Sequence, residues 1–237
     1  NDCLMQLFIS VTGRVQVKSK RRPVAVFLDL EKAFELANRL AITEQLVKKG
    51  VKGKMLAWLA DYLLDRTASV RFQGFLSERM VFENGTPQGA IISPFLFNLL
   101  MEELVEQQYS SQSIVLSYAD DLLLVNPMAT DSAIRDDLET IEDACEDLGF
   151  KISGKKTKAM QFRTKTVAPF PLQIQGADIE WVSQFRYLGV LITRTMSMQP
   201  HIDVVKQRVS ARLNVMRRIS GSKSGASNVV LTKYYKA

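Results

Sequence analysis

The order of apolar segments along the chain predicts an α+β fold, in which an antiparallel sheet packs with helices. Strand-length apolar runs and helical segments do not alternate along the sequence as they do in a parallel α/β sheet. The runs 114–118 and 122–125 are separated by three residues, which is typical of an antiparallel hairpin. Helical spacing of apolar residues over 131–148 and 200–219 adds long helices to these strands.

The first half of the chain contains two helices, a strand and a hairpin. Apolar residues at helical spacing predict an amphipathic helix over 4–15. The run 24–30 (VAVFLDL) is almost entirely apolar and follows a proline, which is typical of a buried strand. A second helical pattern covers 55–64. The short runs 70–72 and 80–82 flank a glycine, and they predict the two strands of a hairpin.

The second half of the chain has clear boundary signals. Ser93 and Pro94 mark the start of a long helix, because proline is tolerated in a first helical turn. The acidic helix over 131–148 is predicted to end at Gly149 as a C-cap. The linker-like stretch is 221–227 (GSKSGAS). Short β-prone runs lie at 157–162, 170–175 and 185–193.

The composition is that of a globular protein with a basic tilt. The 237 residues include 31 Lys and Arg against 25 Asp and Glu, a formal net charge of +6, and 46% are hydrophobic. This content suffices for a sizeable core and excludes intrinsic disorder. Cys3 and Cys145 are too few for a disulfide framework and lack the spacing of a zinc site, so an intracellular setting is expected. No apolar run reaches the ~18 residues of a membrane span.

Charge is distributed unevenly along the chain. Residues 14–22, 151–165 and 206–236 contain basic but no acidic side chains, whereas 131–147 contains eight acidic residues and one arginine. A solvated face explains any single block, but two acid-free blocks in the C-terminal third favour a polyanionic partner. The chain starts without Met and ends beside an apolar stretch, so we expect it to be part of a longer protein.

Three aspartates lie in apolar sequence, where an ionised carboxylate is costly. Asp29 lies in the run 24–30, and Asp120 and Asp121 lie between IVLSY and LLLV. A lone aspartate at a strand end is usually explained by a turn that it caps. That explanation fits less well for the adjacent Asp120 and Asp121, with Asp29 in another apolar run. Adjacent like charges resist joint ionisation unless a cation lies between them, and Mg²⁺ is the hard cation for oxygen ligands. Two such ions about 4 Å apart would bind the attacking and leaving oxygens of a phosphoryl displacement. The acids therefore predict nucleotidyl transfer.

Several motifs, in the correct order, resemble the palm motifs of reverse transcriptases. They are 27–34 (FLDLEKAF), 84–89 (NGTPQG) with Ser93 and Pro94 following, and 118–121 (YADD). The longer run 85–98 and the later 185–189 (FRYLG) are similar to the non-LTR (LINE-like) retrotransposon type. The resemblance implies a right-hand polymerase palm with a partial thumb helix.

The resemblance implies roles for the acids and their neighbours. Asp29 and Asp120 would be catalytic metal ligands for two Mg²⁺ ions, which Mn²⁺ could replace. Asp121 would be a weaker or accessory catalytic ligand. The backbone carbonyl of Leu30 would be a further ligand at the bound nucleotide.

The resemblance also implies a catalytic role for a lysine. Lys156, in the sequence GKKT, matches the lysine proposed to protonate the leaving pyrophosphate. Lys155 and Lys158 are competing candidates, and a solvated charge run is an equal alternative. Other family members usually have Asn-Pro before this motif, whereas this chain has Ser153 and Gly154, so we expect a looser loop.

Substrate contacts are implied for residues of the first three motifs. Gln88 and Gly89 would lie against the incoming nucleotide and the template, where glycine permits a close backbone approach. Phe34 would pack under the sugar and exclude a 2′-hydroxyl, with plain core packing as the alternative. Tyr118 would set the tight turn before the acids. Other family members usually have Asp directly after the Phe of this motif, whereas this chain has Glu35. We expect Glu35 to point to a turn and not to the metals.

The resemblance also divides the chain. It implies a palm with residual fingers at 1–165, primer-grip strands at 166–199 and the start of a thumb at 200–237. Primer-grip contacts are implied for Phe185, Tyr187, Leu188 and Gly189, and duplex phosphate contacts for Lys206, Arg208 and Arg212. The implied partners are an RNA template, a DNA primer and dNTPs, without a membrane or an obligate protein partner. The implied location is intracellular, in the nucleus.

The function that these observations predict is RNA-directed DNA polymerisation during retrotransposition. An RNA-dependent RNA polymerase shares the Asp-Asp turn, but Phe34, five residues after Asp29, argues against it. A catalytically inactive, nucleic-acid-binding remnant of a retroelement is the other alternative, and the intact acids argue against that. Most of the fingers and thumb are expected outside the chain, so we expect the fragment alone to polymerise poorly.

Overall fold

A computed structural model describes residues 2–13, 22–164, 170–220 and 225–236 of the 237. The chain divides into two compact units, Asn1–Ser183 and Gln184–Ala237. Most of the predicted basic run 14–22 lies outside the described residues. Within the part of the chain that is described, no helix is long and apolar enough to cross a membrane.

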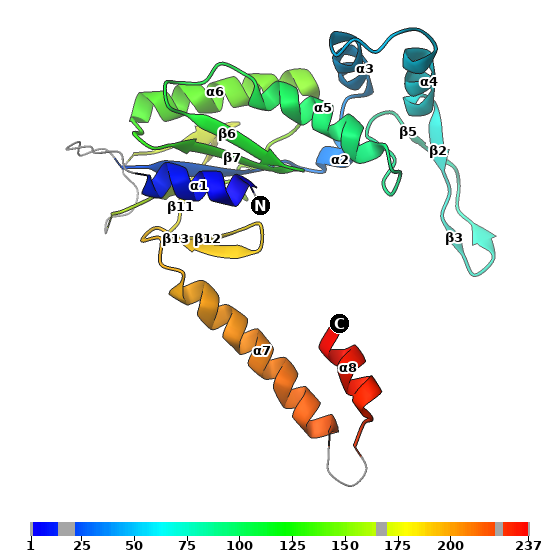
Figure 1. Cartoon of the computed structure of the whole chain (residues 1–237). Coiled ribbons are helices and arrows are strands. Elements are labelled where there is room, and N and C mark those ends of the chain that lie inside the picture. Colours follow the sequence, from blue (N-terminus) through cyan, green and yellow to red (C-terminus); the bar gives the residue numbers. More distant parts are fainter. Residues whose placement is uncertain (1, 14–21, 165–169, 221–224, 237) are drawn as a thin grey trace. The chain divides into compact units, whose positions relative to one another are not determined.

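The first unit is built on a five-stranded sheet, which confirms the α+β prediction (Figure 1). Its strands, in spatial order, are β11 (Glu180–Trp181), β8 (Lys158–Gln161), β1 (Val24–Asp29), β7 (Asp121–Asn126) and β6 (Ile114–Tyr118). The pairs β8–β1, β1–β7 and β7–β6 are antiparallel, as predicted. The short strand β11 pairs parallel with β8, which the sequence did not predict.

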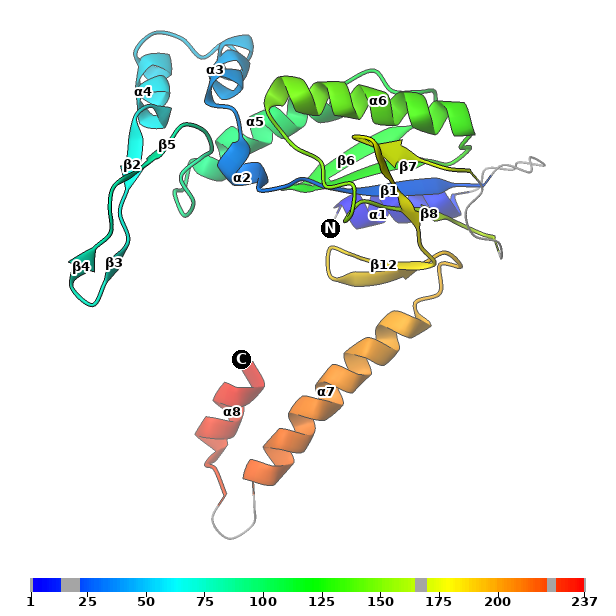
Figure 2. The ribbon, with the colours of Figure 1, turned by 180° about the vertical axis from the view of Figure 1, so that it is seen from behind.

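Helices cover both faces of this sheet, which explains why its central strand is apolar and buried from Val24 to Leu28. Figures 1 and 2 show α5 (Ser93–Val105) and α6 (Asp131–Leu148) on one side and α1 (Asp2–Thr12) on the other. Successive side chains of a strand point to opposite faces, and both sets are buried on β1. The predicted start of α5 at Ser93 and the C-cap of α6 at Gly149, with φ 77°, are confirmed.

A helical region and a hairpin lie between β1 and α5. The helices are α2 (Ala33–Leu36), α3 (Arg39–Lys48) and α4 (Gly53–Leu63). Only α4 was predicted from periodicity. The helix α2 is a single turn that follows Lys32 in a left-handed conformation, and α3 depends on Asn38, whose side chain accepts from the Leu40 and Ala41 amides.

The predicted hairpin is present, but its strands pair differently. Its elements are β2 (Arg66–Ala68), β3 (Arg71–Phe72), β4 (Phe75–Leu76) and β5 (Met80–Phe82). Gln73 and Gly74 both have positive φ, at 49° and 87°, which fits a two-residue turn between Phe72 and Phe75. The run 71–72 therefore pairs with 75–76, and β5 pairs with β2, so the predicted pairing of 70–72 with 80–82 was wrong.

The second unit contains a hairpin and two helices. Its elements are β12 (Gln184–Tyr187), β13 (Val190–Thr193), α7 (Gln199–Ile219) and α8 (Asn228–Lys236). The predicted basic helix is confirmed as α7, whose start is joined to β13 because the Leu191 amide donates to His201 Nδ1 at 3.2 Å. Part of the predicted linker, 221–224, lies outside the described residues.

The first unit is completed by β9 (Gln173–Ile174) and β10 (Ala177–Asp178), a short antiparallel pair.

Candidate active site

Two of the three aspartates face each other across the centre of the sheet. Asp29 is the last residue of β1 and is paired in register with Asp121, the first residue of β7. Directly opposed residues of antiparallel strands lie on the same face, so these carboxylates share one end of the sheet. Asp120 lies in the turn between β6 and β7, beside Ala119, which has a positive φ of 53°. Sequence reasoning placed all three acids together; the strand register pairs Asp29 with Asp121, and Asp120 precedes Asp121 in the turn.

The electrostatics of these acids favour a bound cation. The pKa of the Asp121 carboxyl is raised above its usual value, first because the group is partly removed from water and then because Asp120 and Asp29 are negative. A positive ion beside the three carboxylates would offset this repulsion.

One lysine already contacts the acids. Lys156 Nζ lies 3.1 Å from Asp29 Oδ2 in an ion pair. Lys158 Nζ lies 2.9 Å from Glu180 Oε2 instead, and Lys155 forms no ion pair among the described residues. Of the three lysines in this run, Lys156 is thus the one placed at the end of β1.

The loop that holds Lys156, for which a looser arrangement was predicted, is hydrogen-bonded to β1. The Ser153 amide donates to the Asp29 carbonyl at 2.8 Å, and the Asp29 amide donates to Thr157 Oγ1 at 3.4 Å. Both Ser153 and Thr157 are buried. A Cβ on Gly154 would lie 2.6 Å from the Ala177 Cβ, so the glycine is required by close packing.

The residues at this site suit a hard divalent cation. Their donors are carboxylate oxygens, and Asp29 already holds the Lys156 ammonium as a stand-in cation. In the described part of the chain, however, no three His, Cys, Asp or Glu side chains are arranged as a ready-made metal site. Leu30 forms an antiparallel bridge with Ile152, and the Glu31 amide donates to the Lys151 carbonyl at 2.7 Å. This bridge fixes the backbone at which Leu30 would offer its carbonyl.

Phe34 and Tyr118 face a common cavity next to the acidic turn. The cavity measures about 560 Å³ and is also lined by Ser117 and Ala119. The Phe34 ring is partly buried and stacks on Phe97, with ring centroids 4.1 Å apart. The ring is therefore a packed side chain that also lines an open space, and its exclusion of a 2′-hydroxyl stays a prediction.

The 84–89 loop is fixed by contacts that sequence reasoning missed. Gly85 has a φ of 85°, and a Cβ there would lie 2.6 Å from the Glu35 carbonyl oxygen and 2.7 Å from that of Phe34. Arg66 Nη2 donates to the carbonyls of Asn84 and Gly85 at 2.6 Å each. The only signal for Gly85 was the motif itself, and Arg66 gave no sequence signal.

Glu35 points to the turn at Gln88 and Gly89, as expected. Its Oε1 accepts from Gln88 Nε2 at 3.1 Å, which orients the predicted substrate contact Gln88. Ser93 Oγ donates to the Pro87 carbonyl at 2.6 Å and so ties the loop to the start of α5. Gly89 has a φ of 84°, and a Cβ there would meet no atom within 4 Å, so its backbone is open to an approaching ligand.

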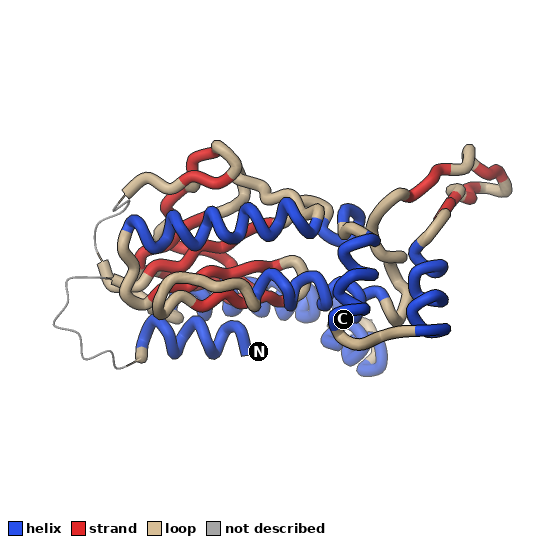
Figure 3. Tube along the Cα trace, turned by 90° about the horizontal axis from the view of Figure 1, so that it is seen from above, coloured by secondary structure: helices blue, strands red, loops and turns tan. Residues whose placement is uncertain are grey.

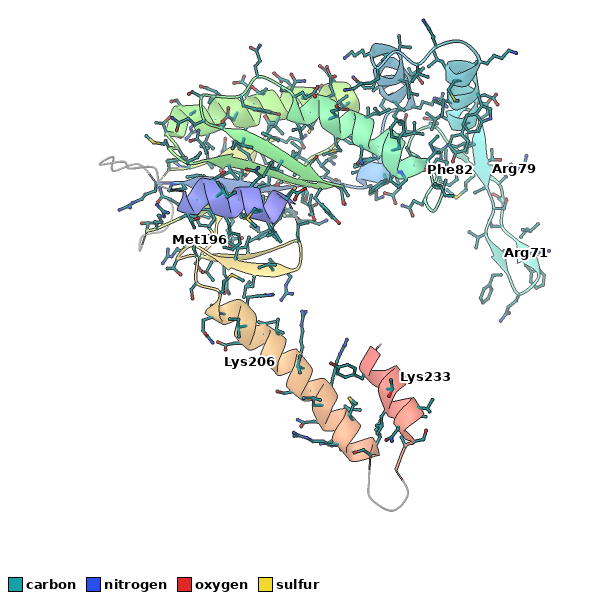
Figure 4. The ribbon with its side chains drawn as sticks, viewed as in Figure 1. Arg71, Arg79, Phe82, Met196, Lys206 and Lys233 are labelled. Atoms are coloured by element: carbon teal, nitrogen blue, oxygen red, sulfur yellow. The ribbon has the colours of Figure 1, made fainter. Side chains whose placement is uncertain are left out.

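The remaining predicted contacts lie in the second unit and are described within it. Leu188 and Gly189 form the β12–β13 turn with positive φ values of 47° and 82°, while Phe185 and Tyr187 belong to β12. Figure 4 shows Lys206 on α7, and the helix also carries Arg208 and Arg212, all three exposed.

Comparison with known proteins identifies the family. The family model described as reverse transcriptase (RNA-dependent DNA polymerase) matches residues 5–192. The chain is 27% identical over 211 residues to a probable RNA-directed DNA polymerase from transposon BS of Drosophila melanogaster, covering 84% of this chain and 23% of the relative. It is 20% identical over 230 residues to the RNA-directed DNA polymerase from the mobile element jockey of the same species, covering 93% and 25%.

Solved structures show the same fold. Telomerase from Candida tropicalis in complex with a fragment of telomeric RNA matches with a TM-score of 0.60 at 12% identity, covering 83% of this chain and 32% of that one. The chain spans about a quarter of the length of the curated relatives described above. The resemblance to reverse transcriptases of non-LTR retrotransposons is confirmed, and the chain belongs to the reverse transcriptase (RNA-dependent DNA polymerase) family.

Proposed function

We propose that this chain is the catalytic palm of an RNA-directed DNA polymerase, which joins dNTPs to a primer 3′-hydroxyl on an RNA template. The observation that carries the proposal is the register pairing of Asp29 with Asp121, with Lys156 bound to Asp29. In this proposal the three acids and Lys156, as the proton donor, would act together at this end of the sheet. In this proposal residues 1–165 are the palm with residual fingers, 166–199 the primer-grip strands and 200–237 the start of the thumb.

Asp29, Asp120 and Asp121 would hold two Mg²⁺ ions, with Mn²⁺ as a substitute and the Leu30 carbonyl as a further ligand. When bound, the metal supplies Lewis-acid activation of the primer hydroxyl and charge neutralisation on the phosphates. The fixed pairing of β1 with β7 keeps Asp29 and Asp121 positioned without a conformational search, so the site is preorganised for nucleotidyl transfer.

Other side chains in the first unit would orient the substrates. Lys156, released from Asp29 by the incoming charge, would donate a proton to the leaving pyrophosphate. Gln88, held by Glu35, and the open backbone of Gly89 would lie against the nucleotide and its template base. Phe34 would form the wall under the sugar, in a cavity that Tyr118 also lines.

The second unit would bind the primer and template duplex. Phe185, Tyr187, Leu188 and Gly189 form the proposed primer grip on a hairpin with a tight turn. Lys206, Arg208 and Arg212 lie within two turns of α7, and their exposed charges suit duplex phosphates. Such contacts position the duplex without reading its sequence.

The test is Asp120→Asn, measured on this chain within a protein of its relatives' length. We expect primer extension on an RNA template to fall by about 10³-fold or more, because an electrostatic contribution to the transition state is removed. Template affinity should change little, because phosphate contacts supply it. Asp136→Asn, which removes an exposed charge on α6, is the matched control and should retain activity. Loss of binding together with extension, or full activity of the Asp120 variant, would contradict the proposal.

A further inference from the structure

A cavity of about 480 Å³ lies in the first unit, between the helices α3, α5 and α6. The helices α5 and α6 lie side by side over the sheet (Figures 1 and 3), and α3 packs against α5. Among the described residues that line this cavity, none belongs to the set proposed for nucleotidyl transfer. Its volume lies within the range of about 300–1,000 Å³ that is typical of ligand sites. The cavity is therefore a candidate for a separate binding site.

The charged groups of the lining are mostly acidic. Carboxylates from all three helices line the cavity, namely Glu44, Glu103, Asp143 and Asp147. Lys48 is the only base among the described lining residues, and its Nζ lies 3.0 Å from Glu103 Oε1. The other three carboxylates form no ion pair within the described part of the chain. In a chain with a net charge of +6, this cavity therefore concentrates charge of the opposite sign.

A buried glutamine in the lining indicates that the cavity holds a ligand. Gln45 lines the cavity and is only 4% exposed, whereas the other buried residues of α3 are apolar. Its side-chain amide has no hydrogen-bond partner among the residues that the structure describes. A buried amide without a partner is costly, so a ligand that supplies the partner would be stabilised here. This amide is an observation independent of the acids.

The chemistry of the lining defines the kind of ligand. A metal ion is not favoured, because no three His, Cys, Asp or Glu side chains of the described residues are arranged to hold one. Nucleic acid would be repelled, because its phosphates and these carboxylates have the same sign. A guanidinium group fits, because its donors form a rigid fork that binds carboxylates, and the Gln45 carbonyl oxygen can accept a further hydrogen bond. It is also more weakly hydrated than an ammonium group, so it enters a partly enclosed cavity at a lower desolvation cost.

We propose that this cavity binds an arginine side chain from a basic segment of another protein. The guanidinium donates to the Gln45 carbonyl oxygen, with Glu44, Asp143 and Asp147 as counter-charges. The acidic face of α6 continues beyond the cavity at the exposed Asp136, so a segment with several positive charges is bound more tightly than a single arginine. This surface goes beyond the proposed polymerase function, because it binds a protein and not a substrate.

The first experiment measures binding of a fluorescein-labelled peptide of alternating glycine and arginine to the 237-residue chain by fluorescence anisotropy. Gln45→Leu should weaken binding by about tenfold, the loss expected for a hydrogen bond to a charged group. Its melting temperature should stay the same or rise, because the variant removes a buried amide that has no partner. A peptide with lysine in place of arginine should bind the unchanged chain several-fold more weakly.

The carboxylates are tested with two matched pairs of substitutions. Glu44→Gln together with Asp147→Asn should weaken binding of the arginine peptide by about tenfold, the sum expected for two partly exposed ion pairs. The control pair is Glu139→Gln with Glu146→Gln, which removes two exposed acids of α6 that do not line the cavity. The control pair should leave the affinity nearly unchanged.

The opposite outcomes would overturn the inference. Equal losses with the two pairs of acidic substitutions would assign the binding to the general charge of α6. Unchanged affinity in Gln45→Leu, or no binding of the arginine peptide at all, would show that the cavity holds no guanidinium. Self-association that is lost in the Glu44 and Asp147 variant, without peptide binding, would show that a second copy of the chain covers the cavity.

Primer extension tests the polymerase proposal separately, because none of these substitutions lies in its proposed site. We expect the Gln45→Leu variant to bind the arginine peptide more weakly and to extend primers at the unchanged rate, within a protein of the relatives' length. Loss of extension in that variant, with peptide binding intact, would overturn the separation of the two sites.

Discussion

Each of the three aspartates near the end of β1 has its own electrostatic environment. Asp29 is paired with Lys156, Asp121 lies opposite it on β7, and Asp120 occupies the turn. The sequence predicted this cluster because charged residues in apolar strands require compensation. The sequence alone could not distinguish Lys156 from Lys155, because the two are adjacent residues of the same type. The fold determines that Lys156 forms the ion pair with Asp29.

The raised pKa of Asp121 predicts a pH-dependent cost to stability. The folded state retains a proton on this carboxyl more readily than the unfolded chain, so the free energy of unfolding falls as pH rises from ~3.9 through the folded pKa. Asp121→Asn should therefore raise the melting temperature at pH 7 by about 1–3 °C, because solvent screens an exposed carboxylate, and should give no gain at pH 3. Thermal unfolding at both pH values checks this. Equal gains at both pH values, or a gain of the same size in Asp136→Asn, would refute it.

The position of Phe34 predicts that the protein selects dNTPs over rNTPs. Its ring lines the cavity beside Tyr118, so a smaller side chain would leave room for a 2′-hydroxyl. Phe34→Val should raise rNTP incorporation relative to dNTP by one to two orders of magnitude, roughly 1.4 to 2.7 kcal/mol. Because the ring also stacks on Phe97, stability should fall by about 1 kcal/mol.

Phe97→Leu provides the control for this prediction, since Phe97 is buried behind Phe34 and does not line the cavity. It should lower the melting temperature and leave the ratio of rNTP to dNTP incorporation unchanged. An unchanged ratio in Phe34→Val would assign that ring to packing alone.

The elements that position the site could be predicted to different extents. The strand β1, the β6–β7 hairpin and the helix α6 follow from local apolar periodicity and from a C-cap glycine, and all are present. The link between Glu35 and Gln88 joins residues 53 positions apart, and no local pattern indicates such a contact. The hairpin register was wrong because it depends on the positive φ of Gln73, which is not a residue that favours that conformation.

The attachment of the 84–89 loop to α2 predicts a strong requirement for Gly85. Gly85→Ala would force a Cβ against two backbone carbonyl oxygens that cannot move independently, at a φ of 85°. We expect a loss of about 2 kcal/mol or more in the free energy of unfolding, measured by urea denaturation. Gly50→Ala is the control, because Gly50 has a φ of 84° but open space around its Cβ position. It should cost about 1 kcal/mol from backbone strain alone. Equal losses in the two variants would show that the close packing of the loop contributes nothing.

The two compact units differ in their balance of charge. The first unit contains the acidic helix α6 and the carboxylate site, whereas the second carries many basic and few acidic residues. In the proposed polymerase, catalytic groups and duplex-binding groups therefore lie in different parts of the chain. Affinity for duplex and the rate of primer extension should consequently respond to different substitutions.

This separation predicts the salt dependence of duplex binding by the 237-residue chain. Binding of an RNA–DNA duplex should be weak and should fall steeply with salt, because phosphate contacts release counterions. Replacing Lys206, Arg208 and Arg212 by glutamine should reduce the slope of log affinity against log salt by about 2.7, from ~0.9 for each phosphate contact. The pair Arg71→Gln and Arg79→Gln is the control and should leave that duplex slope unchanged, because those exposed arginines lie on the β2–β5 hairpin of the first unit. Fluorescence anisotropy over a range of salt concentrations measures both slopes. A duplex slope that depends on the hairpin arginines and not on α7 would contradict the assignment of duplex binding to α7.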